Sequence, residues 1–514
     1  MRARSWLKLS GLGNSLTPAP QKSPRNLGPR SSGRTGTGHF GPNRVGIAGS
    51  VRGPGTFICA ALGAVMLAGC VTTVHNEPIN LPLATSAGDI VEQNRELPVA
   101  GDDLLVGLAF SGGGMRAAAF SYGVLSEFDR IQLGPKQAKA RLIDRVDFLS
   151  GVSGGAITAA YFGLKGRASL SDFHERFLMS NAEESLLTTV TPINVARAYE
   201  GGINDSEQFP RWLDDNLFHG ATFRELGPDH RPRVWINASD IYNRTPFVFS
   251  NETFGAICSD LASYPVANAV AASAAMPVIF APVVLQTFPD RCTARIPAWM
   301  ERARSDAAAP PMLKEYADAV ARYRDGSVPF IKLLDGGLVD NYGLSGFTMA
   351  RLSANTPYGP LTPRQAIKIR RMLFLVVDGG VGPSGDWAQT ADGPTAPEIV
   401  MAAANTAIGS SMRASYTAFD RTMSEWRDSL IGWRCALSAA DRRKYGAPDG
   451  WDCRDLKFFV GRINFDQLGK RRAEELNAVP TRFKLAPEMV EMVVAAGRDA
   501  LRANTTFQAF LSTL

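Results

Sequence analysis

A Gly-x-Ser-x-Gly pentapeptide constrains the fold of this chain more than any other feature. It is Gly151–Gly155, lying between a strand-like segment, 145–150, and an apolar, helix-like segment, 156–164. In a nucleophile elbow, such a turn lifts the central serine above a sheet, at the N-terminus of the next helix. The flanking glycines remove side chains that would collide across the turn. We therefore predict that Ser153 is a nucleophile; the alternative is an ordinary glycine-rich turn.

Further strand-like segments alternate with helix-like ones, and several end in glycines or an aspartate. We predict strands at 104–110, 233–238, 247–250, 331–334, 371–377 and 458–463, and helices at 117–128, 314–324 and from Pro487 onward. The first strand enters the glycine-rich loop 111–116, and two others end at Asp335 and Asp378, each followed by two glycines. This pattern indicates a layered α/β domain with its site at the carboxyl edge of the strands.

The net charge of +6 belongs to the first residues of the chain. Residues 1–69 carry nine basic side chains and no acidic one, which leaves 46 basic against 49 acidic side chains in the remainder. The remainder therefore has a net charge of −3, and we expect no nucleic-acid partner.

The N-terminal segment has the features of an export signal. Residues 57–69 are uncharged and too short to span a bilayer comfortably, and they end in Leu67-Ala68-Gly69 before Cys70. This resembles the lipobox of bacterial lipoproteins, in which the cysteine receives the lipid, so we predict lipidation of Cys70. The alternative is a signal peptide that happens to contain a cysteine. For residues 1–56 we expect a disordered segment; alternatively, translation starts near Val51.

Four cysteines remain after the leader and Cys70 are set aside. Their spacing fits no zinc site, and in an exported protein they allow two disulfides in three connectivities. We favour Cys258–Cys292 and Cys435–Cys453, because these pairs close the shorter loops.

The chain is expected to divide into four parts. Residues 1–69 form the leader, 70–103 a tether, 104–396 the catalytic domain, and 397–514 a mainly helical C-terminal extension packed on that domain. No chemistry is expected in the extension.

The positions of the histidines argue against a Ser-His mechanism. After Ser153 the only histidines are His174, His219 and His230, each in a polar setting with no strong strand before it. A triad of the α/β-hydrolase order places its histidine late in the chain. An aspartate at a strand end must then act as the base.

Three motifs in order resemble the patatin-like phospholipases, which use a Ser-Asp dyad. They are the loop SGGGMR at 111–116, the elbow GVSGG at 151–155 and the segment DGGLVDNYGL at 335–344. The resemblance covers about residues 104 to 380; Ser111 departs from it, since many members carry an acidic residue there. It implies a three-layer α/β/α fold with a mainly parallel central sheet, and hydrolysis of lipid acyl esters without a metal or other cofactor.

The resemblance also implies a role for each motif. Ser153 is the nucleophile and Asp335 the base, chosen over Asp378 because an Asn-x-Gly element follows it. The backbone N–H groups of Gly112, Gly113, Gly114 and Gly154 are the candidate oxyanion donors. Arg116 steadies the loop, contacts a lipid phosphate or forms a salt bridge with the domain.

The function expected on this basis is a lipid-anchored serine hydrolase of phospholipids or lysophospholipids in a bacterial envelope. Because the aspartate that marks inner-membrane retention does not follow Cys70, the outer membrane is the expected location. The alternatives are an acyltransferase with the same dyad, acting on a lipid or a protein, and a non-catalytic lipoprotein that binds the envelope.

Overall fold

A computed structural model describes residues 76–84, 103–133, 140–187, 191–227, 230–292, 295–380, 382 and 386–514. These residues belong to one compact unit, Val71–Leu514. Cys70, the leader, His75 and most of the predicted tether lie outside the described residues.

In this part of the chain eight strands form one sheet. They are β1 (Leu104–Phe110), β2 (Phe148–Val152), β3 (Arg233–Asp240), β4 (Thr245–Phe249), β5 (Val283–Gln286), β6 (Phe330–Asp335), β7 (Arg371–Val377) and β8 (Lys457–Ile463). The order across the sheet is β5-β6-β3-β2-β1-β7-β8, with β4 also paired to β3. Strands β3, β2, β1, β7 and β8 are neighbours in that order and are parallel. Strands β4 and β6 are antiparallel to β3, and β5 is antiparallel to β6.

The register of the sheet brings the predicted motifs to one edge. Phe110 pairs with Gly151 on one side and with Val377 on the other, so the ends of β1, β2 and β7 are level. Val152 pairs with Asn237 of β3, and the next residue of β3, Ala238, pairs with Asp335. Asp335 therefore lies level with the serine that follows β2.

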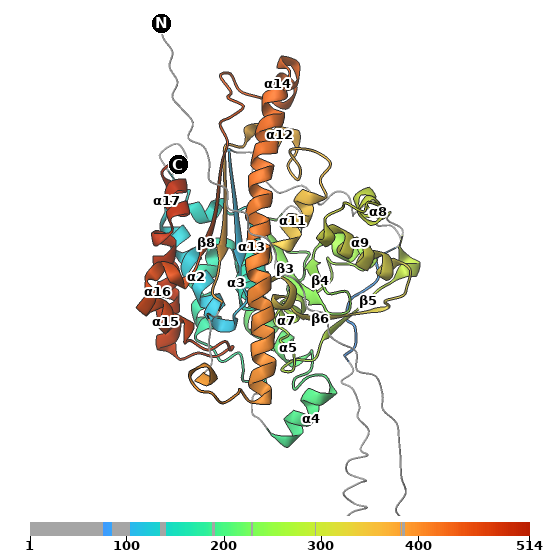
Figure 1. Ribbon diagram of the computed structural model, residues 1–514, viewed down its shortest axis with the longest axis vertical. Coiled ribbons are helices and arrows are strands. Elements are labelled where there is room, and N and C mark those ends of the chain that lie inside the picture. Colours follow the sequence, from blue (N-terminus) through green and yellow to red (C-terminus); the bar gives the residue numbers. More distant parts are fainter. Residues whose placement is uncertain are drawn as a thin grey trace, which may run out of the picture. The chain divides into compact units, whose positions relative to one another are not determined.

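Helices cover both faces of the sheet (Figure 1). They are α2 (Gly114–Arg130), α3 (Gly154–Lys165), α4 (Pro192–Glu200), α5 (Gln208–Leu213), α6 (Asn251–Ala256), α7 (Val266–Ser273), α8 (Ala298–Ser305), α9 (Pro311–Arg324), α10 (Gly337–Asp340), α11 (Ser345–Leu352), α12 (Pro363–Lys368), α13 (Ala396–Ala436), α14 (Ala439–Tyr445), α15 (Lys470–Asn477), α16 (Pro487–Ala503) and α17 (Thr505–Leu511).

Alternate side chains of β1 enter two separate hydrophobic cores, as expected for a strand buried on both faces. Val106 and Leu108 pack with residues of α2, α3 and α16. Leu105 and Ala109 pack on the opposite face with residues of α11 and α13. The prediction of a three-layer α/β/α fold with a mainly parallel sheet is confirmed.

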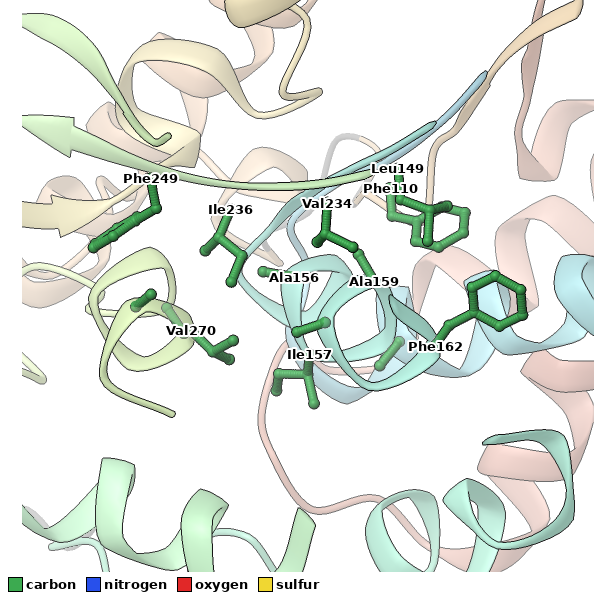
Figure 2. Packing of buried hydrophobic residues seen from close by; sticks show 14 of the residues in the cluster. Phe110, Leu149, Ala156, Ile157, Ala159, Phe162, Val234, Ile236, Phe249 and Val270 are labelled. Atoms are coloured by element: carbon green, nitrogen blue, oxygen red, sulfur yellow. The ribbon is translucent and has the colours of Figure 1, made fainter. Parts of the chain in front are cut away.

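Helix α3, which begins directly after Ser153, is fixed to the sheet by apolar contacts. Figure 2 shows Ala156 and Ile157 of α3 beneath Leu149, Val234 and Ile236 of the neighbouring strands. Each fully buried Leu, Ile or Val side chain contributes roughly 1.5–3 kcal/mol relative to an exposed one. This packing holds the N-terminus of the helix at the carboxyl edge of the sheet.

The C-terminal segment contributes to the sheet as well as covering it. Strand β8 extends the sheet beyond β7, and α16 packs against α2 so closely that a methyl group on Gly123 would lie 2.2 Å from the Val494 carbonyl oxygen. The start of α13 at Ala396 coincides with the predicted boundary, but β8 lies in the same sheet as the motifs.

The two favoured disulfides, Cys258–Cys292 and Cys435–Cys453, are present and confirm that connectivity. Within the described ranges, no helix has the length and hydropathy needed to cross a membrane.

Candidate active site

Ser153 occupies a strained turn between β2 and α3. Its backbone has φ 52° and ψ −123°, in a region that non-glycine residues rarely adopt, and its side chain is nearly buried, with 6% exposed. Such strain persists only where the surrounding structure imposes it, and it is concentrated at functional sites. The predicted elbow is thus present as a backbone geometry.

Buried polar side chains beneath the turn hold it in place. The backbone N–H of Ser153 donates to Ser273 Oγ at 2.8 Å, and the Ser273 hydroxyl donates to the Asn237 carbonyl oxygen at 2.6 Å. The Asn237 amide in turn donates to Ser150 Oγ at 2.8 Å. Sequence reasoning assigned no role to Ser273 or Asn237.

Asp335 lies beside Ser153, and the two side chains are hydrogen-bonded. Its carboxylate also accepts the backbone N–H of Gly337 at 2.8 Å. Burial raises the pKa of Asp335 to about 6, although both hydrogen bonds lower it. A base with a pKa near neutrality abstracts a proton more readily than an ordinary aspartate while remaining ionised at pH 7.

Asp378 has different partners. Its carboxylate accepts the Tyr342 hydroxyl at 2.7 Å and the N–H of Gly380 at 3.0 Å, and Arg462 lies 3.9 Å away. Burial raises its pKa as well. The structure therefore places Asp335, and not Asp378, in contact with Ser153.

The glycine-rich loop differs in one respect from the expectation. The N–H of Gly112 donates to the Asn341 carbonyl oxygen at 3.2 Å, so this group is already occupied. Among the described residues, none accepts a hydrogen bond from the N–H of Gly113, Gly114 or Gly154. Gly113 has φ 141°, a conformation that favours glycine. The candidate oxyanion donors are thus reduced to these three.

The loop and the elbow touch directly. A methyl group on Gly154 would lie 1.9 Å from the Gly114 carbonyl oxygen, so only glycine permits this approach. Gly114 and Gly154 are the first residues of α2 and α3. Two helix N-termini, each with a partial positive charge, therefore meet beside Ser153, where negative charge would be stabilised.

Arg116 supports this loop through hydrogen bonds. Its guanidinium donates to the carbonyl oxygens of Gly379 (2.9 Å) and Val479 and to Thr481 Oγ1 (3.1 Å). The side chain is fully buried, and burial lowers its pKa to about 10. Of the predicted roles, steadying the loop fits these contacts; the partners are carbonyl and hydroxyl oxygens, rather than the carboxylate of a salt bridge.

A cavity of about 720 Å³ opens beside Ser153 and Asp335, a volume typical of ligand sites. Its lining includes these two side chains and Arg116, and also Trp387, Thr406, Met412 and Arg413. The last three belong to α13, in a segment from which no chemistry was expected. Sequence reasoning missed them because no motif marks this helix, and Arg413, one charged side chain at the end of a long uncharged stretch, was the available signal.

The described histidines lie elsewhere. His174 contacts Glu175 and Glu491, His219 contacts Arg176, and His230 contacts the Gly163 carbonyl oxygen. The cavity lining contains no histidine among the residues described. No cluster of three or more His, Cys, Asp or Glu side chains suited to a metal ion is found in these parts of the chain.

Residues 108–348 match the family model of the patatin-like phospholipases, which confirms the resemblance for just under half of the chain, and the fold is the patatin fold. No curated protein matches the sequence.

Two solved structures are weakly similar to the chain. VipD from Legionella pneumophila has 13% identity and a TM-score of 0.29, over 80% of this chain and 67% of that one. Human GIVD cytosolic phospholipase A2 has 11% identity and a TM-score of 0.35, over 84% and 67%. Similarities at TM-scores this low do not indicate a shared mechanism.

Proposed function

We propose that this protein is a serine lipid acyl hydrolase that cleaves acyl esters of phospholipids or lysophospholipids. The observation that carries the proposal is the hydrogen-bonded pair of a strained Ser153 and a buried Asp335 at the cavity. The match of residues 108–348 to the patatin-like phospholipases supports a lipid ester as the substrate.

The mechanism has two steps. Asp335 takes the proton of Ser153 as Oγ attacks the ester carbonyl carbon, and the N–H groups of Gly113, Gly114 and Gly154 stabilise the oxyanion. The protonated Asp335 then gives its proton to the departing alcohol, which leaves an acyl-serine. Water, deprotonated by Asp335, attacks this ester, and the tetrahedral intermediate collapses to free fatty acid as Asp335 returns the proton to Ser153 Oγ.

Arg413 is the candidate contact for the lipid phosphate. It lines the cavity, and no described residue forms an ion pair with it, whereas the guanidinium of Arg116 is engaged by the loop. The shared acyl-enzyme also permits transfer to an acceptor other than water, and hydrolysis is preferred because the cavity is open enough to admit water.

Ser153→Ala tests the proposal. Without its nucleophile the protein should lose at least about four decades of activity on phospholipid, with the midpoint of thermal unfolding unchanged within a few degrees. A fluorophosphonate probe should label the wild type at Ser153 and leave the variant unlabelled. Labelling that persists at another serine contradicts the assignment.

We also propose that the protein is anchored through lipid on Cys70, in a bacterial outer membrane. The support is the sequence before that cysteine. Mass spectrometry of the mature N-terminus tests it, since an unlipidated chain that starts elsewhere contradicts the proposal.

A further inference from the structure

The first third of α13 is an unusual surface helix. No charged side chain occurs from Ile399 to Met412, yet many residues of this stretch are exposed. Ile399 and Val400 are each 53% exposed. Surface helices normally turn a polar face to water, and clustered exposed apolar residues mark sites of interaction.

The same stretch of helix also forms a wall of the active-site cavity. Ala402, Thr406, Gly409 and Met412 line the cavity. The Ser411 hydroxyl donates to a carbonyl oxygen of α10, the helix that directly follows Asp335. One side of this helix therefore contacts the site, and its first residues carry apolar side chains into solvent.

A second group of exposed apolar side chains lies on α4. Its members, by exposed fraction, are Tyr199 (83%), Ile193 (69%) and Val195 (58%). The segment after α4 is joined to the cavity wall, because the N–H of Ile203 donates to the carbonyl oxygen of Val278, two residues after the cavity residue Met276. Val278 is itself an exposed hydrophobic residue. In Figure 1, α4 and the start of α13 reach the same, lower end of the view.

One arginine accompanies the apolar group of α4. Arg197 lies between Val195 and Tyr199, and no described residue forms an ion pair with it. Arg413 lies about 18 Å further along α13 than Met401 and belongs to the cavity. Exposed apolar side chains with a cation among them match a phospholipid bilayer, whose acyl region lies beneath a layer of anionic phosphates.

We propose that residues 399–401 of α13 and residues 193, 195 and 199 of α4 form a docking face for the surface of an anionic phospholipid bilayer. Docking turns the mouth of the cavity toward the membrane, so that an acyl ester enters from the lipid without crossing water. The assignment of lipid as the occupant rests on the proposed function, because the face borders the cavity in which that substrate would react.

Site-specific fluorescence tests where the chain contacts lipid. A polarity-sensitive fluorophore is attached to Val400→Cys, Tyr199→Cys or Leu352→Cys in the full chain, with Cys59, Cys70 and Ser153 replaced by alanine. Leu352 is an exposed control on α11, a helix whose Phe347 packs against the first residue of β2, away from the elbow. Vesicles of phosphatidylcholine and phosphatidylglycerol should shift the emission to the blue at positions 400 and 199 and leave position 352 unchanged.

Kinetics provide a second test. Ile399→Ser combined with Val400→Ser should lower the rate of hydrolysis of the same vesicles at least about tenfold. The reason is that two apolar side chains, whose transfer from water to lipid favours docking, are replaced by polar ones. The rate on a water-soluble short-chain ester should stay within about twofold, since neither residue lines the cavity. Leu352→Ser should leave both rates unchanged.

The two tests separate this inference from the proposed function. Blue shifts at positions 400 and 199, together with a wild-type protein that hydrolyses no ester, would retain the docking face and refute the enzyme. Equal shifts at all three positions, or no shift at 400 and 199, would refute the docking face, as would equal loss of both rates in the double variant. Dimerisation that depends on positions 399 and 400, with no response to vesicles, would assign the face to a second copy of the chain instead.

Discussion

Asp335 and Asp378 end two strands of the same sheet with the same tripeptide, Asp-Gly-Gly. Burial raises the pKa of both carboxyl groups, and each accepts the backbone N–H two residues further on. They differ in the hydroxyl group that each carboxylate meets. Asp335 meets that of Ser153, whereas Asp378 meets that of Tyr342.

The difference arises from strand direction and order. Strand β6 is antiparallel to β3, and its register delivers Asp335 to the level of the residue after Val152. Strand β7 is parallel to β1 and lies on the other side of it from β2, so Asp378 ends beside Ser111. Local sequence therefore fixes the shape of each turn, and the topology of the sheet decides which turn becomes a catalytic base.

Replacing each aspartate with asparagine tests this comparison, and it is the test for which we expect the largest change in activity. Asp335→Asn should reduce kcat/KM at least about a thousandfold, because the amide cannot accept the serine proton. Asp378→Asn should reduce it less than about tenfold. Activity on a soluble ester, with thermal unfolding as a control for the fold, measures both.

A double variant sharpens the result. Since Ser153 and Asp335 act as one unit, Ser153→Ala combined with Asp335→Asn should be no slower than Ser153→Ala alone. A folded but inactive Asp378→Asn protein would reverse the assignment of the two aspartates.

The pH dependence of the rate should also follow Asp335. Because the base must be ionised, kcat/KM should rise about tenfold per pH unit below 6 and level off above it. Steady-state kinetics between pH 4 and 9 measure this, and a rate that is flat through pH 6 would contradict the role of Asp335.

The raised pKa of Asp335 also has a consequence for stability. The pKa of Asp335 in the folded protein, about 6, exceeds the ordinary value of 3.8. Its favourable contribution to the free energy of unfolding is therefore complete below pH 3.8 and is lost as the pH rises through 6. The difference between the two pKa values corresponds to roughly 3 kcal/mol at neutral pH. Asp335→Asn should therefore unfold at a higher temperature than the wild type at pH 8, and this advantage should shrink below pH 4. Equal melting temperatures at pH 8 would contradict the burial of an ionised carboxylate.

Much of the central fold could be predicted from sequence, because its signals are local. The strands predicted at 104–110 and 371–377 have the same bounds as β1 and β7, and the elbow lies at the predicted turn. The choice of Asp335 rested on the Asn-x-Gly element that follows it in the family motif, since both aspartates begin the same tripeptide.

The contribution of the C-terminal segment could not be predicted in this way. The helix beginning at Pro487 was predicted, but nothing in its sequence indicates that α16 would pack on α2. Likewise, the backbone carbonyl oxygen of Arg482 accepts a hydrogen bond from the N–H of Met115, a contact that any residue type could make. Contacts between main-chain groups far apart in sequence leave no residue pattern, so these supports of the glycine-rich loop emerge only from the folded chain.

The contrast between the two aspartates also predicts a change in stability without a change in rate. Tyr342→Phe removes the hydroxyl that Asp378 accepts at 2.7 Å and leaves a buried carboxylate with fewer partners. This should lower the free energy of unfolding by about 1–3 kcal/mol, with kcat/KM within about threefold of the wild type. Denaturant unfolding measures the first and ester hydrolysis the second. A loss of activity as large as that of Asp335→Asn would place Asp378 in the mechanism.

Replacing the histidines tests which group accepts the proton of Ser153. An inflection near pH 6 would ordinarily be attributed to histidine, whose usual pKa is about 6.5. Here the three described histidines contact groups outside the cavity lining. Replacing His174, His219 and His230 with glutamine, singly and together, should change kcat by less than about tenfold and keep the inflection, whereas Asp335→Asn should abolish it. A folded histidine variant that loses activity at saturating substrate, or that loses the inflection, would show that the proton of Ser153 goes to an imidazole and not to Asp335.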